Sequence, residues 1–369
     1  MTSPRLRLDL DALAHNFHLL RQRGAESLPA ERAAAVVKAN AYGLGIGPVA
    51  QRLWQEGCRR FFVAVTEEGI ELRGVLPQAQ IYVLAGATAL TLDELTSHRL
   101  KPVLNTPHQC ALWSQLPDPE PAALHIDTGM HRLGLPWDYD FGSLPALQLE
   151  LIMTHFARAD EWSNPMRQEQ LGRFAACVSL LRDQFPDALL STNNSAAVLS
   201  DHDGPASLLA DAPMDVDRLG IGLYGVNPHV ETDSKPAKQR LANVATLEAQ
   251  VLQVRLVEAG AEVGYGSTYR VSGASRLATI GVGYADGVPR LLSNRGQVYS
   301  RGHRFPIVGR ISMDSLVVEA PDAADCTLQE GDWVEVFGAN LSVDEVARQA
   351  ETIAYEVYTG LGSRVRRLL

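Results

Sequence analysis

Short apolar runs alternate with stretches of helical spacing through the first 225 residues of this 369-residue chain. Such alternation is typical of βα units, in which helices join parallel strands. We predict eight strands, at residues 33–37, 61–65, 80–85, 102–105, 122–127, 149–155, 189–193 and 216–223. Eight units favour a closed (β/α)8 barrel of the TIM type over an open doubly wound sheet, which usually has five or six strands.

The pattern changes after Pro228, where the polar stretch HVETDSKPAKQR leads into strict apolar alternation. Strands are predicted at 246–257, 277–282, 297–300, 316–319 and 333–337, and one helix at 342–350. Ser342 and Glu345 form an S-x-x-E capping box at the start of that helix. We therefore expect an α/β chain, with a barrel domain at 1–230 and a mostly β domain at 231–369.

Composition and charge exclude several classes of partner. Lys and Arg total 33 against 43 for Asp and Glu, and the net charge of −10 argues against nucleic acid. No run approaches the ~18 apolar residues of a membrane span. No His, Cys, Asp or Glu spacing suggests a metal site. The four cysteines, Cys58, Cys110, Cys177 and Cys326, form no CxxC pair, which fits a reducing compartment. We expect a cytoplasmic protein that binds neither nucleic acid, membrane nor metal.

Polar residues gather where the predicted strands end. In TIM barrels the C-terminal strand ends hold the active site, and phosphate groups commonly dock after strands 7 and 8. The residues at these ends are Lys38, Asp127, Thr128, Gly129, His155, Asn193, Asn194, Ser195, Arg218, Gly220 and Ile221. Ser195 and Gly220–Ile221 fall where a phosphate is expected.

Lys38 directly follows the continuous apolar run AAAVV. Burial there would lower the pKa of its amine, which is how an imine-forming lysine becomes nucleophilic. The alternative is an ordinary exposed lysine at the end of a strand. Tyr42 lies one short loop beyond, and the expected phosphate cradle opens at the same barrel mouth. A lysine able to form an imine beside a phosphate cradle is what pyridoxal 5'-phosphate requires.

Two further strand-end residues have both a structural and a functional interpretation. His155, between Thr154 and Phe156, is either a structural histidine or part of the site. Arg218 needs a defined acceptor if it lies inside a barrel strand. A simple ion pair with Asp215 or Asp217 would also explain it.

Two short motifs carry little weight. The glycines of residues 43–47 miss the GxGxxG spacing of a dinucleotide site, and no acidic residue follows at the expected place. Residues 127–129, Asp-Thr-Gly, match an aspartic-protease signature, but the motif occurs once and in a parallel-barrel context.

The second half contains tyrosines beside glycines, in Gly264-Tyr265-Gly266 and in residues 283–287, and the triplet Ser312-Met313-Asp314. Most such tyrosines are half-buried strand residues. Flanking glycines nonetheless indicate side chains held at loop tips, where another surface can meet them.

Taken in order, these motifs resemble the alanine racemase family. The segment AVVKANAYG at 35–43 looks like the cofactor-lysine signature of that family. The resemblance continues through 127–134, 154–160, 194–195, 218–225, 264–266, 283–290, 309–314 and 355–356, and covers nearly the whole chain. It implies an eight-stranded barrel followed by a β domain, in a head-to-tail homodimer with shared active sites.

The resemblance also implies a role for each matching residue. Lys38 would hold pyridoxal 5'-phosphate as an imine and then act as one catalytic base, and Tyr265 of the partner subunit would be the other. The remaining matches are Tyr42, Ser195, Gly220, Ile221 and Tyr355 at the phosphate, His155 against the ring, Arg218 at the ring nitrogen, Arg132 at the phenolic oxygen and the substrate, Met313 and Tyr284 bordering the substrate, and Arg290, Arg310 and Asp160 nearer the entrance.

The implied reaction is the interconversion of L- and D-alanine by two bases. A racemase of broader specificity, acting on serine or basic amino acids, would need a larger pocket than Tyr355 and Tyr284 suggest. Barrel-type decarboxylases normally pair the ring nitrogen with an acidic residue, and Arg218 argues against them. A non-catalytic protein that binds the cofactor would need neither the β domain nor Tyr265.

Two positions depart from the family pattern. His125 stands where the family often has a lysine that becomes carbamylated and braces the arginine. Arg132 is then held by His125, by an inorganic anion such as chloride, or less firmly. Ser312 replaces a frequent cysteine beside Met313.

Overall fold

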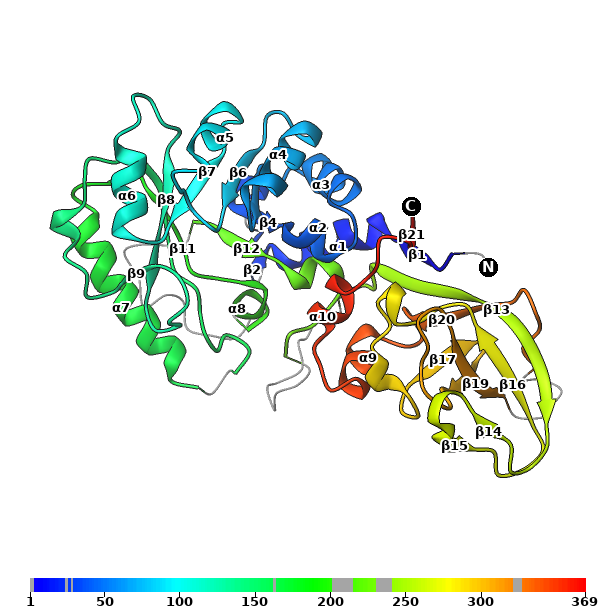
Figure 1. Cartoon of the computed structure of the whole chain (residues 1–369). Coiled ribbons are helices and arrows are strands. Elements are labelled where there is room, and N and C mark those ends of the chain that lie inside the picture. Colours follow the sequence, from blue (N-terminus) through cyan, green and yellow to red (C-terminus); the bar gives the residue numbers. More distant parts are fainter. Residues whose placement is uncertain are drawn as a thin grey trace.

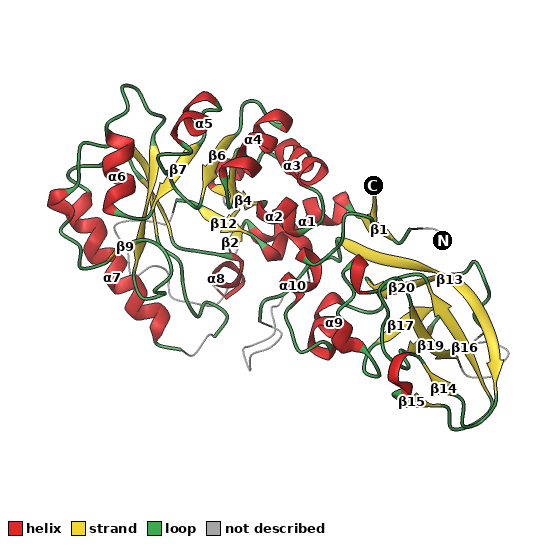
Figure 2. Ribbon diagram, in the orientation of Figure 1, coloured by secondary structure: helices red, strands yellow, loops and turns green. Residues whose placement is uncertain are grey.

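The computed structural model describes residues 3–23, 26–27, 29–161, 164–200, 215–229, 241–320 and 327–369. The chain forms a barrel surrounded by helices and a second, mostly β unit beside it (Figure 1). Both termini lie at the junction between the two units, where β1 and β21 are placed. The colouring by secondary structure shows this division, because most of the helices lie around the barrel strands, whereas strands and loops make up most of the second unit (Figure 2).

Eight parallel strands form the barrel, which confirms the predicted fold class. Their order along the sheet is β11-β10-β8-β7-β6-β5-β4-β12. A parallel bridge between Asn194 and Arg218 brings the two ends of this sheet together. The strands are β4 (Ala33–Val36), β5 (Arg60–Val63), β6 (Gln80–Val83), β7 (Lys101–Leu104), β8 (Ala122–Asp127), β10 (Leu149–Met153), β11 (Leu189–Ser191) and β12 (Asp217–Leu219), with the short β9 (Leu135–Pro136) beside β8.

The last barrel strand is shorter than the sequence predicts. The prediction of strand through 216–223 is wrong beyond Leu219, because the 3-10 turn η4 (Ile221–Tyr224) follows there. The backbone N–H groups of Gly220 and Gly222 donate to the Ser195 hydroxyl, so they are not available to a neighbouring strand. The chain thus leaves the barrel sheet at Gly220, and the amides of Gly220 and Gly222 point toward the Ser195 side chain.

Alternate residues of the barrel strands face inward and outward, so both faces are buried. The inward side chains form one cluster, with the rings of Phe62 and Tyr82 stacked at 4.7 Å. The outward ones pack against the surrounding helices. These helices are α1 (Leu10–Leu20), α3 (Ile46–Gln55), α4 (Thr66–Val75), α5 (Leu92–Ser97), α6 (Pro107–Ser114), α7 (Met166–Leu181) and α8 (Ser195–Ser200). In the described part of the chain, no helix is both long and apolar enough to cross a membrane.

The second unit is built around the long strand β13 (Ala245–Val257). It pairs with β1 (Arg5–Leu8), β16 (Ser275–Ile280) and β20 (Trp333–Phe337), all antiparallel. The other elements are β14 (Glu262–Val263), β15 (Tyr269–Arg270), β17 (Gln297–Ser300), β18 (His303–Pro306), β19 (Leu316–Ala320), β21 (Arg366–Leu368), α9 (Val343–Gln349) and α10 (Ala354–Thr359). The mostly β architecture is confirmed. The Ser342 hydroxyl caps α9 by accepting from the Glu345 N–H at 3.2 Å.

The first strand of the chain lies in the sheet of the second unit, beside β13 and β21. The sequence placed 1–230 in the barrel domain, but β1 is outside the barrel. The expected boundary at 230–231 and Cys326 both lie outside the described residues.

The loop after β4 and the helix α10 meet at a close backbone contact. Gly43 has a φ of +84°, and a Cβ atom there would lie 2.2 Å from the carbonyl oxygen of Tyr358. The Arg367 guanidinium donates to the Gly43 carbonyl at 2.7 and 3.0 Å. The second unit is therefore fastened to the segment that carries Lys38.

Replacing Gly43 with alanine tests this contact. Gly43→Ala should lower the free energy of unfolding by about 2 kcal/mol or more, because it adds left-handed strain to a backbone clash. Gly47→Ala is the control, because a Cβ there meets nothing within 4 Å. It lies in α3 and should be neutral or stabilising by up to about 1 kcal/mol. If denaturant titrations gave the same change in the free energy of unfolding for Gly43→Ala and Gly47→Ala, the close contact at Gly43 would be contradicted.

Candidate active site

The turn that follows Lys38 is left-handed. After β4 and Val37, the four residues Ala39–Tyr42 have φ between +51° and +56°. Each such residue costs roughly 1–2 kcal/mol for an L-amino acid, so the surroundings must impose the conformation. Strain of this size concentrated beside a strand end is typical of functional sites.

Two polar side chains hold this turn in place. The Glu68 carboxylate accepts from the Ala39 N–H at 2.6 Å, and the Asn40 side-chain oxygen accepts from the Ile46 N–H at 2.7 Å. The sequence analysis selected neither Glu68 nor Asn40 as a supporting residue. Only Asn40, a residue type that tolerates left-handed φ, offered a local signal.

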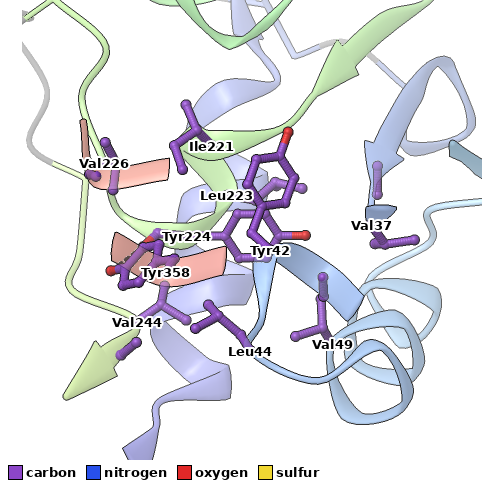
Figure 3. Packing of buried hydrophobic residues seen from close by; sticks show 14 of the residues in the cluster. Val37, Tyr42, Leu44, Val49, Ile221, Leu223, Tyr224, Val226, Val244 and Tyr358 are labelled. Carbon is purple, nitrogen blue, oxygen red and sulfur yellow. Dashed lines mark hydrogen bonds between the residues drawn. The ribbon is translucent and has the colours of Figure 1, made fainter. Parts of the chain in front are cut away.

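Tyr42 returns from the turn into the core at the barrel mouth. Figure 3 shows its ring beside that of Tyr224, and the two ring centroids are 4.9 Å apart. The ring of Tyr355 lies 6.0 Å away. A Cβ at Gly220 would lie 2.7 Å from the Tyr42 phenol oxygen, so the phenol approaches bare backbone. Burial raises the pKa of Tyr42 and raises that of Tyr355 to about 12, so both phenols remain donors.

Ser195 and η4 form a cradle of neutral donors next to these phenols. The Ser195 hydroxyl is buried and accepts from the N–H groups of Gly220 at 2.9 Å and Gly222 at 3.2 Å. The phenols of Tyr42 and Tyr355, the Ser195 hydroxyl and residues 220–221 all line the same cavity. Backbone N–H groups after barrel strands 7 and 8 are the usual partners of a phosphate. These residues fit a phosphate-bearing ligand.

Arg218 is fully buried and held by oxygen atoms of the barrel. It donates to the Thr154 carbonyl at 2.6 Å and to the Ser191 hydroxyl. Burial lowers its pKa to about 10, which leaves it charged at neutral pH. The sequence left open a simple ion pair between Arg218 and Asp215 or Asp217. Asp215 instead lies 3.6 Å from Arg32, and Asp217 accepts from the Asn193 side chain at 3.0 Å.

His155 lies beside Arg218 and is uncharged. Burial, followed by the charge of Arg218, lowers its pKa well below the usual value. The Arg218 guanidinium lies 3.4 Å from Nδ1 and has only protons to offer, so Nδ1 is the acceptor. The ring proton is therefore on Nε2, which makes His155 a donor on its other side.

His125 shows the opposite tautomer. Its Nδ1 lies 2.8 Å from the Asn105 side-chain oxygen. The Asn105 amide nitrogen donates to the carbonyls of Leu84 and Val103, so that oxygen must accept and Nδ1 must carry the proton. Burial, together with the charge of Arg218, lowers the pKa of His125 to about 4. The neutral ring thus offers its Nε2 lone pair on the side away from Asn105.

Asp127 organises the loop that carries Arg132. Its carboxylate accepts from the N–H groups of Gly129 at 2.9 Å, Met130 at 2.8 Å and His131 at 3.1 Å. This turn explains the Asp-Thr-Gly triplet structurally. Arg132 leaves the loop on the cavity side with its side chain exposed.

These residues line a cavity of about 490 Å³, well within the usual range for small-molecule sites. Burial and then the charge of Arg132 lower the pKa of Lys38, which favours a reactive amine. The predicted residues that meet here are Lys38, Tyr42, Arg132, His155, Ser195, Arg218, Gly220, Ile221 and Tyr355. The lining residues that the sequence did not single out as site residues include Val36, Phe62, Ala64, Leu84, Leu133 and Met153. Apart from Leu133, which lies in the loop between β8 and β9, their signal was a position in or directly after a barrel strand.

Six residues that the resemblance assigned to the site or its entrance do not line this cavity. Tyr265, Tyr284 and Met313 belong to the second unit, where they are 70%, 42% and 53% exposed. Tyr265 lies in the loop joining β14 to β15, which Figure 1 shows at the far end of the second unit from the barrel. Arg290 and Arg310 are in the same unit, whereas Asp160 lines a neighbouring cavity of about 420 Å³ on the barrel side. A single copy of the chain thus keeps Lys38 and Tyr265 apart.

Among the described residues, no three His, Cys, Asp or Glu side chains come together as a set of metal ligands. The cavity instead combines one lysine, two arginines and two neutral histidines with hydroxyl donors. This arrangement suits a small anionic ligand that reacts with an amine.

Comparisons with known proteins agree over the whole chain. A family model described as the N-terminal domain of alanine racemase matches residues 8–228, and one described as the C-terminal domain matches residues 244–369. An alanine racemase of Rhodospirillum rubrum is 40% identical, over 98% of this chain and 94% of the relative. One from Brucella abortus is 38% identical, over 98% of this chain and 92% of the relative.

A solved structure gives the same result. The alanine racemase of Bartonella henselae, crystallised with covalently bound pyridoxal phosphate, superposes with a TM-score of 0.85 at 36% sequence identity. The match covers 100% of this chain and 99% of that one. The family resemblance stated from the motifs is confirmed.

The buried neutral state of His125 predicts a loss of stability in acid. The unfolded histidine has a pKa of about 6.5 and the folded one about 4, so the unfolded chain binds the extra proton between these values. The contribution of His125 to the free energy of unfolding is therefore complete above about pH 6.5. It should shrink by about 3 kcal/mol as the pH falls to about 4.

Denaturant titrations across this pH range would measure the effect. His125→Asn should lose less stability than the wild type on acidification. His108→Asn, at an exposed position, is the control and should follow the wild-type curve. If the free energy of unfolding of His125→Asn fell with pH as steeply as that of the wild type, the assignment of a neutral His125 would be contradicted.

Proposed function

The chain belongs to the alanine racemase family, and we propose that it interconverts L- and D-alanine with pyridoxal 5'-phosphate at a site completed by a second copy of the chain. One observation carries the proposal. The cavity holds an activated Lys38 beside a phosphate cradle, while Tyr265 of the same chain is presented outward. A second copy can supply its Tyr265 to each cavity, because the Tyr265 of the same chain does not line it.

Different residues of the cavity would bind different parts of the cofactor. Tyr42, Ser195, Tyr355 and the backbone of residues 220–221 would bind the phosphate through uncharged donors, and Lys38 would hold the aldehyde carbon. His155 would lie against the ring, and Arg218 would donate toward the ring nitrogen. The bound cofactor supplies an electron-withdrawing system that takes up the charge left when the α-carbon loses its proton.

Inversion at the α-carbon needs a proton carrier on each face of a planar centre. The lowered pKa of Lys38 lets its amine take or return the proton on one face. Tyr265 of the second copy does the same on the other face. Because each group serves as base in one direction and acid in the other, the site works on both enantiomers.

Arg218 tunes the chemistry at the ring nitrogen. Its pKa of about 10 keeps it protonated, so it donates a hydrogen bond and has no proton to give up at neutral pH. A donor of this kind would leave the ring nitrogen of the bound cofactor unprotonated and would weaken the electron withdrawal that the cofactor supplies. A weaker acceptor limits side reactions such as transamination, and a decarboxylase with an acidic partner at this position would have the opposite property.

Arg132 binds the carboxylate of the substrate and the phenolic oxygen of the cofactor. His125 faces the same cavity as a neutral ring with a free acceptor nitrogen, in place of an anionic brace. We assign His125 as the acceptor that steadies Arg132. Tyr355 and, from the second copy, Tyr284 and Met313 narrow the pocket around a methyl side chain. These residues favour alanine over serine or a basic amino acid.

The proposal also covers the dimer, the domain boundary and the cellular location of the chain. The functional unit is a homodimer with two shared sites, supported by the exposed Tyr265, Tyr284 and Met313. The domain boundary near 230–231 falls between the two family matches. A cytoplasmic location is supported by Cys58, Cys110 and Cys177, which are buried free thiols and fit a reducing compartment.

Substitution of Lys38 separates cofactor attachment from folding. Lys38→Ala should abolish the visible absorbance of covalently held cofactor and lower racemisation by at least about 1,000-fold, because attachment and one proton carrier are both lost. Absorbance spectra and a coupled D-alanine assay measure the two effects. An unchanged spectrum would remove Lys38 from the proposal.

Substitution of Tyr265 tests the second proton carrier alone. Tyr265→Phe should keep the cofactor spectrum and lower the turnover rate by about 100- to 10,000-fold, the usual worth of a general acid or base. Tyr269→Phe is the control, because Tyr269 lies just beyond the same loop but donates to Glu319. Its turnover should stay near wild type. Full activity of Tyr265→Phe would contradict the two-base site.

Sharing of the site predicts complementation between inactive variants. Co-refolded Lys38→Ala and Tyr265→Phe chains should form hybrid dimers in which one cavity has both groups intact. Racemase activity should then return, to about a quarter of the wild-type level, because random pairing makes half of the dimers hybrid and each hybrid has one working site of two. Activity that never rises above the two parents would place Lys38 and Tyr265 in the same copy.

A further inference from the structure

Arg364 joins separate segments of the second unit through one guanidinium. Its Nε donates to Asp286 Oδ1 at 2.7 Å, and its Nη2 donates to Asp286 Oδ2 at 3.2 Å and to Asp314 Oδ1 at 2.6 Å. A planar donor fork that meets a carboxylate in this way fixes direction as well as distance. We call Arg364, Asp286 and Asp314 the rim clamp.

Asp286 is the buried member of the rim clamp. Its side chain is 2% exposed, against 46% for Arg364. A buried carboxylate needs a cation and further donors, and Asp286 Oδ2 also accepts from the Gly283 N–H at 2.8 Å. The shape of the short turn η6 (Tyr284–Asp286) therefore depends on where Arg364 holds this carboxylate.

The same interactions tie Tyr284 to Met313. The Tyr284 N–H donates to the Ser312 carbonyl at 3.1 Å, and the Ala285 N–H donates to the Met313 carbonyl at 3.0 Å. Arg364 Nη2 also lies 3.4 Å from the Met313 carbonyl. Two exposed side chains that the proposed shared site places beside the substrate are thus carried on two linked segments. Arg364 contacts one segment at the Asp286 carboxylate and the other at the Met313 carbonyl and the Asp314 carboxylate.

We propose that Arg364 is a positioning residue that sets substrate specificity, by holding Tyr284 and Met313 at the rim of the second copy's site. This inference rests on the shared site proposed above. Arg364 contacts neither substrate nor cofactor and acts only through the segments that it clamps. A looser rim admits a substrate side chain larger than methyl and binds alanine less well.

A competing effect would act within the same copy. The Gly362 N–H donates to the Asp286 carbonyl at 3.1 Å, and this segment follows α10, whose Tyr355 lines the chain's own cavity. A disturbance passed along this route would change cofactor binding instead of substrate choice. The test therefore needs to separate the two routes.

Arg364→Lys is the variant that tests the clamp. Lysine keeps the charge that Asp286 requires but loses the fork. The KM for alanine should rise about three- to tenfold with kcat changed less than about twofold, because substrate placement is lost and not proton transfer. The preference for alanine over serine should fall by a similar factor. The cofactor dissociation constant, measured by absorbance titration, should stay at the wild-type value.

Arg304→Lys is the matched control. Arg304 forms a similar fork with Glu345 in the same unit, with its Nη2 3.0 Å from Oε2, and neither residue adjoins the rim segments. Both variants should lower the melting temperature slightly, but only Arg364→Lys should change KM and specificity. Asp314→Asn, which loosens only the exposed half of the clamp, should give a smaller change in the same direction.

Hybrid dimers decide which copy the clamp serves. When one chain carries Lys38→Ala, the single working site uses Lys38 of the other chain and the rim of the Lys38→Ala chain. Arg364→Lys should raise KM when placed on the Lys38→Ala chain and leave it unchanged when placed on the other. An equal effect in both placements, or an Arg304→Lys effect of the same size, would overturn the proposal.

Failure of the clamp is distinguishable from failure of the shared site. If hybrids of Lys38→Ala and Tyr265→Phe regain activity while Arg364→Lys changes nothing, the clamp is wrong and the shared site stands. If those hybrids stay inactive, the shared site itself is wrong.

Discussion

A planar carbon can be inverted only if proton carriers stand on both of its faces, and one copy of this chain brings a single carrier to its cavity. Lys38 lies at the barrel mouth, whereas Tyr265 is exposed on a loop at the far end of the second unit. In the proposed shared site, this separation gives the β unit its role. The second unit brings Tyr355 to its own barrel mouth, but its loop between β14 and β15 lies at the far end, where Tyr265 is 70% exposed.

The barrel mouth itself is held by interactions that cross between the two units. A left-handed turn without glycine is costly, and the chain stabilises it with Glu68, with Asn40 and with the contact between Gly43 and Tyr358. α10 thus has two tasks, because it braces this turn and also brings Tyr355 to the phosphate cradle. Cofactor binding and the packing of the two units are therefore parts of one structure.

Much of this architecture could be predicted from the sequence. The eight barrel strands followed from apolar runs between helical stretches, and Lys38 stood out because a lysine rarely ends such a run. The end of β12 could not be predicted, since residues 220–223 are apolar enough for a strand. Their amides turn away because Ser195, distant in sequence, accepts from them.

Other features depend on pairs of residues that only the folded chain brings together. The tautomer of His125 is set by Asn105, which directly follows the neighbouring strand β7, and the rim clamp joins Arg364 to Asp286, 78 residues apart in the sequence. No local pattern marks either pair. The motifs did identify Tyr265, Tyr284 and Met313, but only the structure shows that all three are exposed and lie outside the lining of their own cavity.

The most direct test is a crystal structure of the dimer with an alanine analogue bound to the cofactor. The account predicts the Lys38 amine and the Tyr265 phenol of the other copy on opposite faces of the analogue, each within about 3.5 Å of its α-carbon. Both groups on one face, or Tyr265 still directed into solvent, would contradict it.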